Sequence, residues 1–142
     1  MSDLETKQLA CALLAERHMR LAEGVRGLLE AIFKRVYLVA DTASLSDGTY
    51  RLQPNLIVLD LSLTDGHLDS ILLEIKQQSP SSRIVVLTVH DDPTVASLAL
   101  QAGAHGVVLN RRIGSELLLA VDRVLNGREY VSADFGLDAR AI

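Results

Sequence analysis

Polar side chains stand at four points where apolar runs of the chain end. Glu16 and Arg17 follow the first run, Asp60 lies near the end of a later one, and Thr88 and Asn110 mark the ends of two more. An acid beside a cation, a second acid, a hydroxyl and an amide are thus available to one polar site. Within such a site an arginine fork can satisfy a carboxylate without any metal ion.

Other chemistries find no support in the sequence. No Ser/His/Asp or Cys/His set indicates covalent catalysis of another kind, so we expect no enzyme of that type. The turn at Thr64, Asp65 and Gly66 has no phosphate-cradling pattern. The histidines show no metal-ligand spacing and are predicted to be ordinary loop or surface residues. They are His18, His67, His90 and His105.

Two alternating patterns define the elements that must position these residues. Continuous apolar runs typical of buried strands cover 9–15, 36–40, 56–61, 84–89 and 106–109. Apolar residues at helical spacing cover 18–33, 68–78, 93–102 and 115–125. The segment 42–53 is rich in residues that are poor in a helix interior, such as Ser44, Asp47 and Gly48. It is therefore predicted to form a short or irregular helix.

Strands that are apolar on both faces and separated by helices predict an α/β fold whose parallel sheet is covered on both sides. Five such repeats indicate a doubly wound five-stranded sheet of order 2-1-3-4-5 with right-handed crossovers. Ligands of such sheets bind at the carboxyl ends of the strands, near the switch point between strands one and three. We expect a tail at 1–8, one domain at 9–127, and a tail or the start of a linker at 128–142.

The composition restricts the number of domains, the binding partners and the cellular location that we expect for the protein. The 142 residues suffice for one domain, and hydrophobic (49%) and charged (23%) residues are in ordinary balance. A net charge of −4 argues against direct binding of nucleic acid by this segment. The single cysteine, Cys11, cannot form an internal disulfide. Neither a membrane-spanning run nor a signal-peptide pattern is found, which favours a soluble, cytoplasmic protein without membrane contact.

The residues around the strand ends resemble the response-regulator receiver family of two-component systems. The stretches that carry the resemblance are LLAERH at 13–18, PNLIVLDLSL at 54–63, VVLT at 85–88 and AGAHGVVLN at 102–110. The similarity covers about residues 9–132. The ending NGREYVS at 126–132 resembles receivers that precede a helix-turn-helix DNA-binding domain.

The resemblance implies a flavodoxin-like receiver that takes a phosphoryl group from a sensor histidine kinase or a small phosphodonor. Asp60 matches the phosphoacceptor, and Thr88 matches the phosphate-sensing hydroxyl. Glu16, Asp60 and the backbone carbonyl of Ser62 match the groups that hold Mg²⁺ in the family. The resemblance also implies that the chain can form a homodimer.

Three positions depart from the family pattern. Arg17 stands in place of the second acid, Asn110 in place of the lysine, and Val107 in place of the switching aromatic. A cation instead of an acid next to the metal site weakens the binding of a metal ion by roughly several kcal/mol, even at an effective dielectric constant near 20. We therefore expect binding of Mg²⁺ to be weakened.

Two functions stay open on these grounds. In the first, Asp60 is phosphorylated and acts in a phosphorelay by altered means. In the second, the chain is a pseudo-receiver that docks or dimerises without phosphorylation, with Arg17 and Asp60 in a fixed ion pair. A flavodoxin-like enzyme is disfavoured because no Ser/Thr-rich phosphate loop follows the first strand. Whether the chain stands alone or belongs to a longer regulator that contacts DNA through an output domain is equally open.

Overall fold

A six-stranded parallel sheet forms the centre of the chain in the computed structural model, which describes residues 9–133 and 135. The predicted tail at 1–8 lies outside the described residues, as do 134 and 136–142 of the second tail. The spatial order is β2-β1-β3-β4-β5-β6. The strands are β1 (Leu9–Ala15), β2 (Phe33–Val39), β3 (Leu56–Asp60), β4 (Arg83–Thr88), β5 (Gly106–Leu109) and β6 (Tyr130–Val131).

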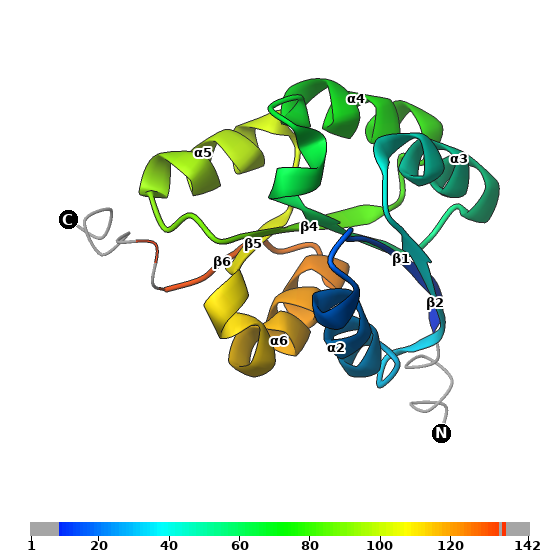
Figure 1. Cartoon of the computed structure of the whole chain (residues 1–142), viewed down its shortest axis with the longest axis horizontal. Coiled ribbons are helices and arrows are strands. Elements are labelled where there is room, and N and C mark those ends of the chain that lie inside the picture. The colour runs from blue at the N-terminus through cyan, green and yellow to red at the C-terminus, as the bar shows by residue number, and fades with distance from the viewer. Residues whose placement is uncertain (1–8, 134, 136–142) are drawn as a thin grey trace.

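Helices cover both faces of the sheet, as predicted (Figure 1). On one face lie α2 (Met19–Leu29) and α6 (Ile113–Leu125), and on the other lie α3 (Thr42–Leu52), α4 (Leu68–Gln78) and α5 (Pro93–Ala102). Two short 3₁₀ helices, η1 (Leu61–Thr64) and η2 (Asn110–Arg112), follow β3 and β5. Alternate strand residues pack into two apolar clusters, one under each helical layer. Of the described helices, none is both long and apolar enough to cross a membrane.

The strand order 2-1-3-4-5 is confirmed, and β6 extends it by one strand. Tyr130 pairs with Gly106, and Val131 pairs with Val107. The backbone N–H of Ser132 then donates to the carbonyl of Val107 at 3.0 Å. A strand of two residues carries no periodic pattern, which is why the sequence predicted only a tail or linker in this segment.

The segment predicted to be a short or irregular helix is a regular one, so that prediction was wrong. The side chain of Asp41 accepts from the backbone N–H of Ser44 at 2.7 Å and caps α3. Leu45 is buried against the sheet. Gly48 packs closely on the sheet, since a Cβ there would lie 3.2 Å from the side chain of Leu13. The cap and this contact outweigh the low helix propensity.

The first predicted helix ends earlier than the apolar spacing suggested, at Leu29 instead of 33. Glu30 closes it by donating its N–H to the carbonyl of Arg26 at 2.9 Å. Phe33 then starts β2 and is buried in the core. Its position fits helical spacing by coincidence, and tertiary packing decides that it belongs to the strand.

His105 lies in a loop, as predicted, but its ring has a structural role. Its ring Nδ1 accepts from the backbone N–H of Ile84 at 2.9 Å. The backbone N–H of His105 donates to the carbonyl of Ile84 at 2.8 Å. Burial, assisted by the charges of Arg83 and Lys76, lowers the pKa of His105 to about 4. The neutral ring thus joins the start of β5 to β4 near neutral pH.

Candidate functional site

A pocket of about 660 Å³ lies at the carboxyl edge of the sheet, where the sequence placed the site. Asp60, Thr88 and Asn110 line it together with Ser62 and His18. Asp60 and Thr88 end the neighbouring strands β3 and β4 and are 4% and 1% exposed. The strand ends therefore bring the three predicted pocket residues together.

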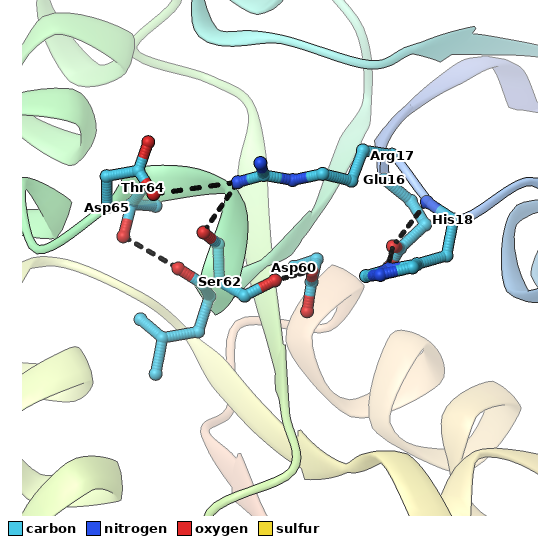
Figure 2. A network of polar contacts seen from close by, with 8 residues as sticks. Glu16, Arg17, His18, Asp60, Ser62, Thr64 and Asp65 are labelled. Carbon is cyan, nitrogen blue, oxygen red and sulfur yellow. Dashed lines mark hydrogen bonds and ion pairs between the residues drawn. The ribbon is translucent and has the colours of Figure 1, made fainter.

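The carboxylate of Asp60 is engaged from within its own loop. Its Oδ2 accepts a short hydrogen bond from the hydroxyl of Ser62, which belongs to η1 directly after the strand. Figure 2 shows Asp60 at the centre of the polar network, between the groups that follow β1 and those of η1. A buried carboxylate held in this way is presented to the pocket in a fixed orientation.

Arg17 turns away from Asp60 and extends toward η1 (Figure 2). Its guanidinium donates to the backbone carbonyl of Ser62 at 2.8 Å and lies 3.7 Å from the carboxylate of Asp65. The Arg17–Asp60 ion pair expected for a pseudo-receiver is not formed among the described residues, so that expectation was wrong. The bent loop after β3 explains why. It places the Ser62 carbonyl and Asp65, which has a φ of 49°, within reach of the guanidinium.

Glu16 is buried and pairs with His18, which was predicted to be an ordinary loop or surface residue. Its Oε2 accepts from the backbone N–H of His18 at 3.0 Å and lies 2.9 Å from Nδ1 of the same residue. Its Oε1 is buried without a hydrogen-bond partner among the described residues. The position of His18 two residues after an acid at a strand end was the signal that could have singled it out.

The remaining predicted residues occupy distinct environments. The Thr88 hydroxyl accepts from the backbone N–H of His90 at 3.0 Å, which leaves its own hydrogen available to the pocket. Oδ1 of Asn110 is buried without a partner in the described part of the chain. Val107 is fully buried within the apolar cluster that faces α3, α4 and α5. It fills the core and presents no side chain that could rotate to the surface.

The two arginines after Asn110 are held by acids of their own surroundings. Arg111 lies 3.5 Å from the carboxylate of Asp91, and Arg112 donates to Glu116 at 2.9 Å. Asn110 lines the pocket, whereas neither arginine is among the described residues that line it. The side chain that this segment contributes to the pocket is therefore the neutral amide of Asn110.

The sequence matches the family model of the response regulator receiver domain over residues 12–122. The chain belongs to the response-regulator receiver family. The matched region contains β1 from Ala12 onward, β2 to β5 in full, and every residue of the predicted site. The fold, the pocket and the family model agree on this assignment.

Curated regulatory proteins are similar to the chain over part or most of its length. The methanol utilization control regulatory protein MoxX of Paracoccus denitrificans is 29% identical over 126 residues, which are 85% of this chain and 56% of that protein. The oxygen regulatory protein NreC of Staphylococcus haemolyticus is 34% identical over 80 residues, 56% of this chain and 37% of that protein. The chain thus matches only about a third to just over half of the length of these relatives.

A solved receiver structure matches closely. The two-component response regulator of the LuxR family from Aurantimonas sp. SI85-9A1 is 27% identical and has a TM-score of 0.84. The match covers 95% of this chain and 100% of that one. The two chains therefore share one fold.

Receivers in general bind Mg²⁺ at an acidic pocket, and the groups in this pocket fit that ion poorly. Mg²⁺ needs oxygen ligands in near-ideal octahedral geometry. Here the Ser62 carbonyl accepts from Arg17 at 2.8 Å, so a guanidinium charge lies beside one of the oxygens that would hold the ion. A positive charge at this distance disfavours a divalent cation.

Proposed function

We propose that this receiver accepts a phosphoryl group on Asp60 in a two-component phosphorelay. The observation that carries the proposal is the buried Asp60 carboxylate in the pocket beside the Thr88 hydroxyl. A carboxylate of this kind can attack phosphorus, and a neighbouring hydroxyl can then donate to the new phosphate.

The transfer balances without a further reactant. An oxygen of Asp60 forms the new P–O bond, while the P–N bond of a phosphohistidine or the P–O bond of an acyl phosphate breaks. The leaving imidazole takes up a proton, or the acyl phosphate leaves a carboxylate. The amide of Asn110, which lines the pocket, supplies a neutral N–H donor. In this proposal the Arg17 guanidinium, whose two contacts are exposed, turns from Asp65 toward the phosphoryl oxygens.

The proposed partners follow from the family. A sensor histidine kinase or a small phosphodonor supplies the phosphoryl group, and a second copy of the chain is the partner for dimerisation. The setting is cytoplasmic. Contact with DNA is proposed through a separate output domain, since this chain has a net charge of −4.

A second function is favoured by one specific observation. Arg17 satisfies the Ser62 carbonyl, and the Ser62 hydroxyl satisfies Asp60, so part of the pocket is closed by internal bonds. A receiver held in this way can act as a phosphorylation-independent docking or dimerisation module. It would then use the receiver surface rather than the pocket.

Treatment with acetyl phosphate separates the two functions. We expect intact mass measurement to reveal the gain of one phosphoryl group, both with Mg²⁺ and with a chelator in its place. The gain should vanish in Asp60→Asn and persist in Asp69→Asn, an exposed acid that lines the same pocket. No gain on a folded protein supports the docking module, and a gain that survives Asp60→Asn moves the acceptor to another residue.

A further inference from the structure

Glu16, His18 and Asp60 form a compact cluster at the carboxyl edge of the sheet. One ligand atom from each of them lies within 4.8 Å of the others. Two of the three are buried carboxylates, and the third is an exposed imidazole. Figure 2 shows His18 and Glu16 together on one side of Asp60, with the Arg17 guanidinium extending to the opposite side.

The buried carboxylate of this cluster is incompletely satisfied. The Glu16 side chain has no exposed surface, and its Oε1 has no hydrogen-bond partner in the described part of the molecule. Asn110, which lines the adjoining pocket, also has a buried Oδ1 without a partner. An unpaired buried oxygen costs about 1–3 kcal/mol, and more when the group is charged. A cation bound at the cluster would offset that cost.

The donor atoms favour one class of cation. An imidazole with two carboxylates is a mixed nitrogen and oxygen set, and imidazole suits Zn²⁺ and Ni²⁺ better than Mg²⁺. Nδ1 of His18 lies 2.9 Å from Oε2 of Glu16. Adjacent ligands of a tetrahedral ion with bonds of about 2.1 Å are about 3.4 Å apart, so the exposed His18 ring would move outward by about 0.5 Å. The ion would replace the proton shared by these two atoms.

The arginine that disfavours Mg²⁺ is less of an obstacle here. Its guanidinium donates to the Ser62 carbonyl, which is not one of the three ligands of this cluster. Its charge is directed toward Asp65 at 3.7 Å, on the far side of Asp60. The charge of Arg17 therefore lies next to the oxygen that a hard-cation site would use and away from the imidazole of His18.

We propose that Glu16, His18 and Asp60 bind a divalent transition-metal ion of the Zn²⁺ and Ni²⁺ class in preference to Mg²⁺. This site differs from the oxygen-only Mg²⁺ site of receivers in its ligand His18 and in its metal. Binding does not require Asp60 to be a phosphoacceptor. A bound ion would lie on the carboxylate of Asp60 and would add a positive charge to the pocket.

Calorimetric titration of the whole chain with Zn²⁺, without a phosphodonor, tests the proposal. We expect one ion per chain, and Mg²⁺ should bind about 100-fold more weakly or worse. His18→Asn and Glu16→Gln should each weaken Zn²⁺ binding by about 100-fold. The matched control is His67→Asn, because His67 is exposed at the start of α4 and does not line the pocket. It should bind Zn²⁺ like the unaltered protein.

Zn²⁺ affinity that is the same in His18→Asn as in the unaltered chain would overturn the proposal, as would tighter binding of Mg²⁺. The His18 side chain is 69% exposed, so its replacement should leave the fold intact, and a thermal melt checks this. As a second measurement, imidazole NMR signals of His18 should shift with one equivalent of Zn²⁺ while those of His67 and His105 stay in place. Since no phosphoryl transfer is read, failure of this site and failure of the proposed phosphorelay function are distinguishable.

Discussion

Two buried glutamates in this molecule have opposite surroundings. Glu16 is 3% exposed and Glu116 is 7% exposed. Glu16 accepts only from His18, and one of its oxygens has no partner among the described residues. Glu116 accepts from Ser132 at 2.7 Å, Tyr130 at 3.0 Å and Arg112 at 2.9 Å. A fully satisfied carboxylate stabilises the fold, while a partly satisfied one is available to a ligand.

The Glu116 network joins α6 to the last strand. The Ser132 hydroxyl that donates to Glu116 also accepts from the backbone N–H of Leu109 at 3.1 Å. Burial alone would raise the pKa of Glu116, but the hydrogen bonds from Ser132, Arg112 and Tyr130 outweigh it and lower the pKa. Burial and the bond to Glu116 raise the pKa of Tyr130 to about 12. Both shifts favour the bonded state near neutral pH.

The largest expected effect comes from changing the charge of the pocket. Arg17→Asp removes a cation, adds an acid and releases the Ser62 carbonyl from its hydrogen bond. Mg²⁺ affinity should rise by about 100-fold, since a unit charge a few ångströms away acts with several kcal/mol even at an effective dielectric constant near 20. Calorimetric titration with Mg²⁺ measures the change.

The control for this charge change is Arg20→Asp, an exposed residue of α2 that does not line the pocket. It should leave Mg²⁺ affinity within about twofold, because an exposed charge is screened by water and salt. Equal Mg²⁺ affinity in Arg17→Asp and the unaltered chain would contradict the role given to Arg17.

Removal of the satisfied glutamate should cost stability instead of binding. Glu116→Ala leaves the donors of Ser132, Tyr130 and Arg112 without their acceptor. We expect the free energy of unfolding to fall by about 3 kcal/mol, because hydrogen bonds to charged groups are stronger than neutral ones. Urea denaturation measures it, and Glu23→Ala, at an exposed position of α2, should change it by less than about 0.5 kcal/mol.

Acid provides a second check on Glu116. Its lowered pKa means that the contribution to stability is complete above the unfolded value of 4.5 and is lost as pH falls through the folded pKa. The difference in stability between the unaltered chain and Glu116→Ala should therefore shrink below that pH. A difference that stays constant down to the lowest pH at which both proteins fold would show that the charge of Glu116 contributes nothing.

The two regions also differ in how far the sequence could predict them. Glu16, Asp60, Thr88 and Asn110 were predictable because the ends of apolar runs become the carboxyl edge of a parallel sheet. The partner of Arg17 was not, since a backbone carbonyl 45 residues away leaves no trace in residue types.

The Glu116 network was missed for a different reason. Its partners Tyr130 and Ser132 lie in a segment whose two-residue strand is too short to give a pattern. Likewise, the regular α3 depends on the Asp41 cap and on the contact of Gly48 with Leu13, which propensity alone does not contain. Tertiary contacts decide these features.

The smallest expected effect gives the sharpest comparison, because it makes one chemical change at both glutamates. Glu16→Gln removes a charge whose Oε1 has no described partner, and the remaining amide oxygen can still accept from the N–H of His18. The free energy of unfolding should change by less than about 1 kcal/mol, since relief of buried charge offsets the weaker bond. Glu116→Gln loses charge-assisted hydrogen bonds, so its free energy of unfolding should fall by about 2 kcal/mol or more. Urea denaturation of the pair measures both, and equal losses would mean that Glu16, too, is held for structure rather than for a ligand.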